Sequence, residues 1–338
     1  MRLVFCGTPE IAVPTLRRLL ATPDHSVVGV ITQPERPRGR ERERAESPVK
    51  IAARAAGLEV FQPGKIRLPE VQAWLEAKAP DAAVLIAYGQ ILPARLLSIP
   101  RLGWINLHAS LLPRYRGAAP IPWSIARGET RTGITTMQID AGMDTGPILL
   151  QREIEIGADE TTPELSARMG EAGAPLILET LEGLARGTLV PRPQESAQAS
   201  SAPMLKREDG RIRWEWSAAE IYNRMRGFSP WPGTFAEFRG KRVHLWGRPA
   251  ALELPEEGAG IVETYPKPTQ LPLDDTPPSR IVALVRPGFI FPVKNSLFVC
   301  CGSSTWLEVT EVQPEGRRRM TAREFERGAH LLLREQFE

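Results

Sequence analysis

The chain has 338 residues, which is long for a single hydrophobic core, so we expect two domains. Apolar residues make up 42% of the sequence and charged residues 25%, a composition that excludes a disordered or fibrous chain. The formal net charge of +3 is too small for a protein that coats nucleic acid, so any contact with a polyanion should be local.

The first half of the sequence alternates between strand and helix patterns, which predicts a parallel sheet of the α/β class. Strands are expected at residues 3–6, 26–32, 58–61, 82–88, 103–108 and 133–139. Helices are expected at residues 9–21, 48–57, 69–79, 119–127 and 162–186. The apolar residues 82–87 are typical of a strand that is buried on both faces of a sheet.

The second half changes character after residue 187. Residues 188–204 are rich in proline and serine and have no apolar period, which indicates a linker. Short strand patterns follow at residues 234–238, 242–246, 260–264, 281–285, 289–292, 296–300 and 306–309, with helices expected at 218–227 and 321–333. Such short strands are typical of a small β-barrel. The predicted division is therefore a first domain over 1–187, a linker over 188–206 and a barrel domain over 207–338.

Membrane and metal chemistry are not expected. No apolar run approaches the length of about 20 residues that crosses a bilayer, and no basic segment precedes an apolar one near Met1. We therefore expect a cytoplasmic protein. The cysteines Cys6, Cys300 and Cys301 are too few and too unevenly spaced for a disulfide framework or a zinc site. No cluster of cysteine and histidine has the spacing of metal ligands.

The most informative segment is residues 106–120, because it places two polar side chains at the end of an apolar strand. Asn106 and His108 are two residues apart, so a strand projects both side chains to the same face of its sheet. Together they could hold one reacting carbonyl group. The alternative interpretation is a polar pair that only satisfies hydrogen bonds at a strand end.

Two further loops follow predicted strands, at residues 87–93 and 140–147. We expect both strands to run parallel to the strand of His108, so that the two loops and the polar pair meet at one crevice. Asp144 would favour a protonated His108 that can donate to an oxyanion, with Asn106 as a second donor. No serine or cysteine is placed as a nucleophile, so we expect a nucleophile on the substrate to attack a carbonyl group.

Other site types are not supported by the sequence. The glycine after the first strand, Gly7, is not followed by the G-x-G-x-x-G spacing of a dinucleotide site, and no glycine-rich loop ends in Gly-Lys-Ser/Thr. Binding of a nicotinamide cofactor or of ATP is therefore not expected. The remaining histidines, His25, His244 and His330, are expected to be structural.

The run Asn-Leu-His-Ala-Ser-Leu-Leu-Pro-Arg-Tyr-Arg-Gly-Ala-Ala-Pro-Ile at 106–121 and the pattern Asp-x-Gly-x-Asp-Thr-Gly at 140–146 closely resemble the folate-dependent formyltransferases. The resemblance covers nearly the whole chain and is weakest at 248–296. It implies a Rossmann-like catalytic domain followed by an OB-like β-barrel. It also implies transfer of a formyl group from 10-formyltetrahydrofolate to the amino group of initiator methionyl-tRNA, by a monomeric enzyme.

The resemblance further implies roles for individual residues. The catalytic residues would be Asn106, His108 and Asp144. The folate contacts would be Ile86, Ala87, Tyr88, Gly89, Gln90, Ser110, Leu111, Leu112, Pro113 and Asp140. The tRNA contacts would be Arg36, Arg38, Arg40, Lys206 and Arg207. Among these, Arg40 matches the key arginine of a loop that enters the acceptor stem.

Two segments depart from the family pattern. Residues 40–46 alternate arginine with glutamate where the family is more uniformly basic, and residues 249–278 are rich in proline and acidic residues, as in an insertion away from the tRNA. Three alternatives stay open: a sugar-nucleotide N-formyltransferase, a 10-formyltetrahydrofolate hydrolase and a noncatalytic RNA-binding protein. The arginine loop favours the tRNA acceptor, and the intact polar triad argues against a noncatalytic protein.

Overall fold

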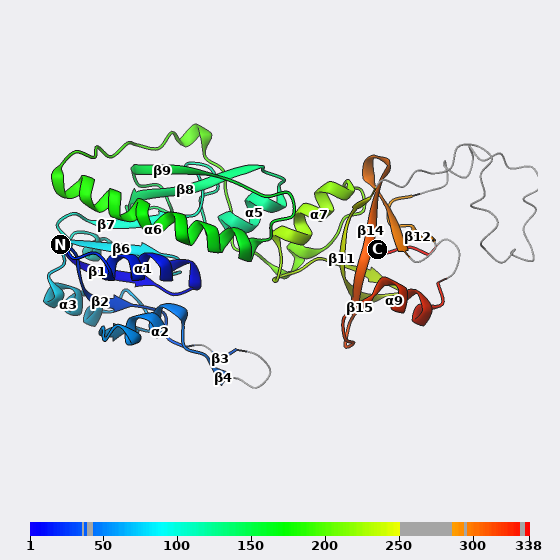
Figure 1. Cartoon of the computed structure of the whole chain (residues 1–338), viewed down its shortest axis with the longest axis horizontal. Coiled ribbons are helices and arrows are strands. Elements are labelled where there is room, and N and C mark those ends of the chain that lie inside the picture. Colours follow the sequence, from blue (N-terminus) through cyan, green and yellow to red (C-terminus); the bar gives the residue numbers. More distant parts are fainter. Residues whose placement is uncertain (36, 39–42, 251–285, 294–295, 332–334) are drawn as a thin grey trace, which may run out of the picture. The chain divides into compact units, whose positions relative to one another are not determined.

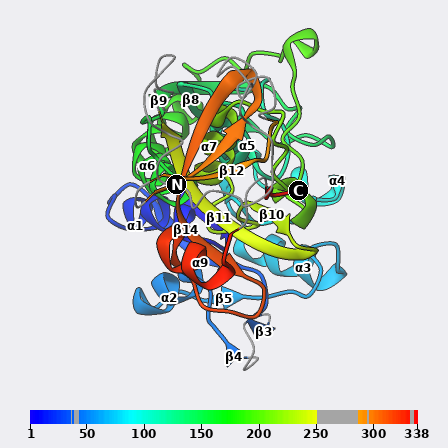
Figure 2. The ribbon, with the colours of Figure 1, turned by 90° about the vertical axis from the view of Figure 1, so that its right-hand side faces the viewer.

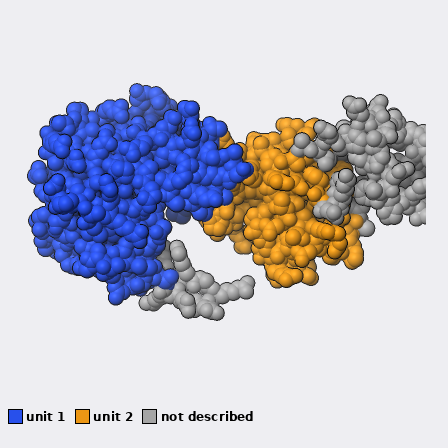
Figure 3. Space-filling view, in the orientation of Figure 1, with its two compact units in different colours: residues 1–125, 129–205 blue, residues 126–128, 206–338 orange. Residues whose placement is uncertain are grey.

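The computed structural model describes residues 1–35, 37–38, 43–250, 286–293, 296–331 and 335–338. The described chain forms two compact units, which Figure 3 shows in blue and orange. Unit 1 comprises residues 1–125 and 129–205, and unit 2 comprises residues 126–128 and 206–338. The expected strands at 260–264 and 281–285, and most of the acidic segment 249–278, lie outside the described residues.

Unit 1 is built on one mixed sheet (Figure 1). Its strands are β1 (Arg2–Gly7), β2 (Ser26–Ile31), β5 (Val60–Phe61), β6 (Ala82–Ile86), β7 (Trp104–His108), β8 (Arg131–Gln138) and β9 (Ile148–Glu155). They lie in the order β5-β2-β1-β6-β7-β8-β9, and the pairs from β5 to β7 are parallel. This confirms the α/β class. The direction of strand order reverses between β1 and β6, and ligands of such sheets bind where that reversal occurs.

Helices cover both faces of this sheet. They are η1 (Glu10–Ala12), α1 (Val13–Leu20), α2 (Pro48–Ala55), α3 (Pro69–Lys78), α4 (Ala94–Leu97), α5 (Pro120–Ala126) and α6 (Thr162–Arg186). In Figure 1, α1 and α6 lie side by side over one face, where their side chains share a core with Ile105 and Leu107 of β7. Trp104 belongs to a second core, with α3 and α4. Because side chains alternate along a strand, Asn106 and His108 lie on the same face as Trp104.

The long helix α6 confirms the prediction for 162–186. Thr161 and Glu164 form a capping box at its start, and Gly187 ends it in a left-handed conformation, with a φ of +67°. The helix approaches β7 closely, because a Cβ atom on Gly173 would lie 2.3 Å from the Cδ2 atom of Leu107. The strand that carries Asn106 and His108 is therefore held from its other face by a helix backbone.

The expectation that the sixth strand runs parallel to its neighbours is wrong. β8 pairs antiparallel with β7, so the loop at 140–147 leaves the sheet at the edge where β7 begins. The next strand, β9, was not expected, and it also pairs antiparallel with β8. The physical reason is that β8 is buried on both faces, which gives it the apolar pattern of a parallel strand although its hydrogen bonds are antiparallel.

Unit 2 contains an antiparallel sheet with the order β10-β11-β14-β13-β12, and β15 also pairs with β14. Its strands are β10 (Phe235–Phe238), β11 (Lys241–Ala250), β12 (Ile290–Val293), β13 (Ser296–Cys301), β14 (Thr305–Pro314) and β15 (Met320–Thr321). Its helices are η3 (Arg207–Gly210), α7 (Ala218–Gly227), η5 (Gly302–Ser304) and α9 (Ala322–Ala329). Figure 2 shows β11 and β14 with α9. Strands β10 and β11 pair as a hairpin through Arg239–Gly240, and Thr321 and Glu324 form a capping box at the start of α9. The sheet is compatible with an OB-like barrel.

Candidate active site

The polar pair lies at the carboxyl end of β7, next to the carboxyl end of β6. Asn106 is 7% exposed and His108 is 6% exposed, so both side chains are largely removed from water. The carboxamide of Asn106 makes no hydrogen bond to another residue in the described part of the chain. Buried polar groups are normally hydrogen-bonded, so this amide is available to a ligand. The site thus has one uncommitted neutral donor.

The imidazole of His108 is oriented by the backbone of the loop that follows it. Its Nε2 atom lies 2.9 Å from the carbonyl oxygen of Tyr115, and a carbonyl oxygen can only accept, so Nε2 carries a proton. The other ring nitrogen, Nδ1, lies 3.6 Å from Oδ2 of Asp144. That distance is too long for a hydrogen bond. A proton on Nδ1 would therefore face a carboxylate and still be free to reach a substrate oxygen.

Asp144 is held in an unusual backbone conformation. Its φ is +54°, in the left-handed region that residues with a Cβ atom adopt rarely. The backbone N–H of Gly117 donates to its Oδ2 atom over 2.8 Å. The preceding turn is closed by Asp140, which accepts from the backbone N–H of Gly142 over 3.0 Å and from the hydroxyl of Thr145 over 2.8 Å. The predicted folate residue Asp140 thus shapes the loop that presents Asp144.

This loop reaches His108 by crossing a face of the sheet. The N–H of Ile139 donates to the carbonyl of Trp104 over 2.9 Å, at the far end of β7. Ile139 also packs against the core of that same face. The loop then ends beside His108, four residues further along β7. The structure therefore brings Asp144 to the polar pair, as expected, but by a path that differs from the expected one.

The segment after His108 is fixed by hydrogen bonds to neighbouring strands. The hydroxyl of Thr135 in β8 donates to the carbonyl of Ser110 over 2.6 Å and accepts from the N–H of Leu112 over 3.1 Å. Gln151 in β9 donates to the carbonyl of Leu112 over 2.9 Å. Ser110 is fully buried, whereas Leu111 and Pro113 are half-buried. Of the residues in this segment that were expected to contact folate, Leu111 and Pro113 are therefore the accessible ones.

The loop after β6 offers exposed backbone. Ala87 and Gly89 are exposed and have positive φ values of 49° and 84°. Between them, Tyr88 points into the core, and its carbonyl accepts from Nε2 of Gln33 over 3.0 Å. The Oε1 atom of Gln33 is buried without a partner among the described residues. Gln33 was not among the residues expected to contact folate, although its position in the loop after β2, beside the strand-order reversal, could have identified it.

Two buried acidic groups near this loop do not suit nucleophilic chemistry. Burial raises the pKa of the Tyr88 hydroxyl far above its ordinary value, and the neighbouring Cys6 thiol adds to that effect. Burial also raises the pKa of the Cys6 thiol. Both groups therefore favour their protonated forms near neutral pH.

The residues expected to contact tRNA are only partly described. Arg36 and Arg40 lie outside the described residues, and Arg38 belongs to the short strand β3 (Pro37–Arg38), which pairs with β4 (Glu43–Arg44). Lys206 and Arg207 are exposed at the start of unit 2.

The base of the arginine loop is closed by ion pairs. Lys50 of α2 pairs with Glu35 on one side of the loop and with Glu46, over 3.0 Å, on the other. Glu46 also pairs with Arg54 over 2.7 Å. Hydrogen bonds to Glu35 and Glu46 raise the pKa of Lys50. The hydrogen bond from Lys50 in turn lowers the pKa of Glu46. Glu46 therefore forms ion pairs with two cations of α2.

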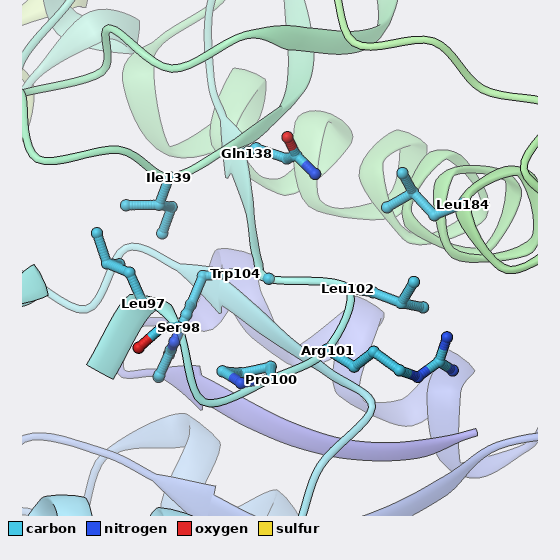
Figure 4. A pocket seen from close by; sticks show the side chains of 10 residues that line it. Leu97, Ser98, Pro100, Arg101, Leu102, Trp104, Gln138, Ile139 and Leu184 are labelled. Atoms are coloured by element: carbon cyan, nitrogen blue, oxygen red, sulfur yellow. The ribbon is translucent and has the colours of Figure 1, made fainter. Parts of the chain in front are cut away.

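A separate cavity of about 440 Å³ lies at the other end of β7, between Arg101, Trp104, Gln138 and Leu184 (Figure 4). Trp104 begins β7 and His108 ends it, so this cavity is not the crevice of the polar pair.

Within the described residues, no group of three or more His, Cys, Asp or Glu side chains could hold a metal ion. The described helices are also all too short or too polar to cross a membrane.

Comparison with known proteins gives consistent results over both units. A family model described as formyl transferase matches residues 1–181, and one described as formyl transferase, C-terminal domain, matches residues 204–330. A methionyl-tRNA formyltransferase of Acidobacterium capsulatum is 49% identical over 98% of this chain and 97% of its own, and one of Solibacter usitatus is 46% identical over 98% and 96%. The crystal structure of WlaRD, a sugar 3N-formyl transferase in the presence of dTDP and 5-N-formyl-THF, has a similar fold. Its TM-score is 0.60 at 15% identity, over 94% of this chain and 99% of its own.

Gly117 packs closely against the backbone of Ala202. Its φ is +123°, and a Cβ atom there would lie 2.5 Å from the carbonyl oxygen of Ala202. We expect Gly117→Ala to separate residues 115–119 from residues 200–202. The amide of Ala202, which donates to the carbonyl of Arg116 over 2.7 Å, should then exchange its hydrogen about tenfold faster or more. Hydrogen-exchange mass spectrometry measures this. Gly64→Ala, at a glycine with open space around it, is the control, and equal protection in both variants would contradict the prediction.

Proposed function

The chain belongs to the formyl transferase family, in its methionyl-tRNA formyltransferase branch, and on that premise we propose how its residues carry out the reaction. The enzyme transfers a formyl group to the free amino group of methionyl-initiator tRNA and so gives N-formylmethionyl-tRNA for translation initiation. The observation that best supports this chemistry is the approach of Asp144 to His108 beside the uncommitted carboxamide of Asn106.

The formyl donor in this proposal is 10-formyltetrahydrofolate. Residues 86–90 would receive its pterin ring, because the exposed backbone of Ala87 and Gly89 and the unpartnered oxygen of Gln33 suit a flat ligand with hydrogen-bonding edges. Leu111 and Pro113 would contact the folate, with Ser110 and Leu112 supporting them from behind. The similarity to a transferase crystallised in the presence of a formyl-tetrahydrofolate supports this choice of donor.

Asn106 and His108 would stabilise the negative charge that develops on the formyl oxygen when the amine attacks. Asn106 donates through its carboxamide, and His108 donates through a proton on Nδ1 while Tyr115 holds its Nε2–H. Two donors aimed at one oxygen in a buried site are effective, because they are oriented before the charge appears. The hydrogen bond to Tyr115 fixes which ring nitrogen is available for this task.

Asp144 would serve as counter-charge to the protonated His108 and would help to remove the proton of the attacking amine. An ammonium group has no lone pair, so the amine must lose a proton before or during attack. The carboxylate accepts one backbone hydrogen bond, from Gly117, and its side chain is 17% exposed. It therefore retains oxygen lone pairs for a proton from the amine, directly or through water.

The acceptor tRNA would contact the arginine loop and the start of unit 2. We propose Arg36, Arg38, Arg40, Lys206 and Arg207 as contact residues, of which Lys206 and Arg207 are exposed. Each contact between a cation and a phosphate releases counterions, so binding should weaken with salt. A cytoplasmic location and a monomeric state are further parts of the proposal, as are a catalytic domain at 1–187 and a tRNA-binding domain at 207–338, with residues 188–206 joining them in sequence.

A sugar-nucleotide N-formyltransferase or a 10-formyltetrahydrofolate hydrolase could use the same three catalytic side chains. The methionyl-tRNA formyltransferases that are similar to this chain over nearly all its length favour the tRNA acceptor. Water in place of the amine would need a general base, and Asp144 could act on either nucleophile. The acceptor must therefore be decided by assay.

The first experiment mixes the wild-type protein with 10-formyltetrahydrofolate and aminoacylated tRNAs. We expect N-formylmethionine on initiator methionyl-tRNA, and far less on elongator methionyl-tRNA. Release of free formate without formyl transfer would instead indicate the hydrolase. A dTDP-amino sugar in place of tRNA tests the sugar acceptor. The absence of transfer to initiator tRNA would refute the proposed function.

His108→Ala should reduce kcat by about 10²–10³-fold, because one donor to the oxyanion and the partner of Asp144 are lost. The Kd of the folate should change by less than about threefold, since the side chain acts mainly in the transition state. Single-turnover kinetics and folate titration measure the two effects. His25→Ala is the control, because its ring nitrogens bond to no described residue. A near wild-type rate for His108→Ala would remove His108 from the mechanism.

Arg40→Ala should raise the KM for initiator methionyl-tRNA and reduce the salt dependence of tRNA binding, with folate binding intact. The loss of one phosphate contact lowers the slope of log K against log salt by about 0.7–0.9. Filter binding over a salt series measures this slope. Arg17→Ala, an exposed arginine on α1, is the control. If only folate affinity changes, the assignment of the loop to tRNA is wrong.

A further inference from the structure

The segment expected to be a linker forms part of unit 1 and lies along the candidate active site. We call residues 192–202 the strap. At one end, Arg192 and the first residue of β9, Ile148, exchange two backbone hydrogen bonds. At the other end, Arg116 donates its N–H to the carbonyl of Ser200 and accepts from the N–H of Ala202. The strap therefore joins the segment after β7 to the segment after β8.

Gln194 lies within the strap and bonds to both of these segments. Its Nε2 atom donates to the carbonyl oxygen of Asp144 over 2.9 Å and to that of Gly146 over 2.7 Å. Its Oε1 atom accepts from Nε and Nη2 of Arg116, over 3.0 Å and 2.7 Å. The two donors and two acceptor lone pairs of a carboxamide are thereby all used.

The partners of Gln194 are adjacent to the groups that hold the reactive side chains. Arg116 lies between Tyr115, whose carbonyl orients His108, and Gly117, whose N–H donates to the carboxylate of Asp144. The carbonyl of Asp144 is itself a partner of Gln194. One side chain thus links the guanidinium of Arg116, which neighbours the residue that orients the histidine, to the backbone that presents the carboxylate.

The left-handed conformation of Asp144 makes this support necessary. Residues with a Cβ atom adopt such a backbone rarely, and they keep it only where the surroundings over-determine it. The Asp140 turn constrains the start of the loop, and Gln194 constrains Asp144 and the residues after it. Without Gln194 the loop could relax, and the Asp144 carboxylate would lose its defined position beside His108.

We propose that Gln194 is a positioning residue for the formyl transfer reaction, which holds the Asp144 loop against the segment that orients His108. This inference rests on the proposed function. Gln194 contacts the backbone and Arg116, so it acts on the reaction only through the placement of other groups. A displacement of about 1 Å in a catalytic group can cost about 10²-fold in rate.

Two variants test the acceptor oxygen and the donor nitrogen of the Gln194 carboxamide. Gln194→Met keeps the size of the side chain and removes all four hydrogen bonds. Gln194→Glu keeps the acceptor for Arg116 but cannot donate to the carbonyls of Asp144 and Gly146. We expect both variants to lower kcat by about 10–100-fold, with KM values for tRNA and folate within about threefold of wild type. If Gln194→Glu retains wild-type kcat, donation to the Asp144 loop is not needed and the proposal fails.

A matched control lies four residues further along the strap. Gln198 bonds through its side chain to Glu195 and is exposed. Gln198→Met should leave kcat unchanged. An equal loss of kcat in Gln198→Met and Gln194→Met would mean that any change in the strap disturbs the enzyme, and would overturn a specific role for Gln194.

A double-mutant cycle separates positioning of Asp144 from a general structural role. In an Asp144→Asn background, Gln194→Met should lower the remaining transfer rate by less than about threefold, because the group that it positions no longer functions. An equal fold-loss in both backgrounds would overturn the proposal. Single-turnover rates at high enzyme concentration make the slow variants measurable.

A readout that does not depend on activity completes the test. Gln194→Met should accelerate hydrogen exchange at the amide of Gly117, which donates to the Asp144 carboxylate, and should leave exchange in β1 unchanged. Faster exchange with no transfer by the wild-type protein would support the positioning and refute the proposed function. Normal transfer by the wild type with unchanged kcat and exchange in Gln194→Met would refute the positioning alone.

Discussion

The approach of the Asp144 carboxylate to the His108 imidazole is the constraint on which the rest of unit 1 depends. The two side chains come from segments that leave the sheet at opposite edges, since β8 runs antiparallel to β7. Bringing them together requires a loop that crosses a sheet face and an aspartate in a left-handed conformation. The Asp140 turn, the N–H of Gly117 and the carboxamide of Gln194 all act against the relaxation of that loop.

Much of this arrangement could be predicted from local patterns in the sequence. The period of two along β7 places Asn106 and His108 on one face, and the structure confirms that apolar Ile105 and Leu107 enter the opposite core. Helix α6 was predicted at residues 162–186, the bounds that the structure shows, and a capping box and a terminal glycine mark its two ends. The motifs at 106–121 and 140–146 identified the family without knowledge of the fold, and the family models confirm it.

The parts that could not be predicted depend on contacts between distant segments. The direction of β8 is set by its partners, because a strand buried on both faces has the same apolar pattern in either direction. The residues 192–202 have the composition of a linker, and no local pattern reveals that Gln194 meets Asp144 and Arg116 across about 50 and 78 residues of sequence. A lone glutamine in a proline-rich segment carries no signal of such a role.

The close packing of Gly173 against Leu107 has a consequence for the opposite face of β7. Because the backbone of α6 leaves no space behind Leu107, the strand cannot retreat when a substrate presses on the side chains in front of it. Asn106 and His108 are therefore backed by a closely packed helix, whereas the loop of Asp144 is held by hydrogen bonds from the Asp140 turn, Gly117 and Gln194. The two sides of the candidate site are thus fixed in different ways, by close packing behind β7 and by polar contacts around Asp144.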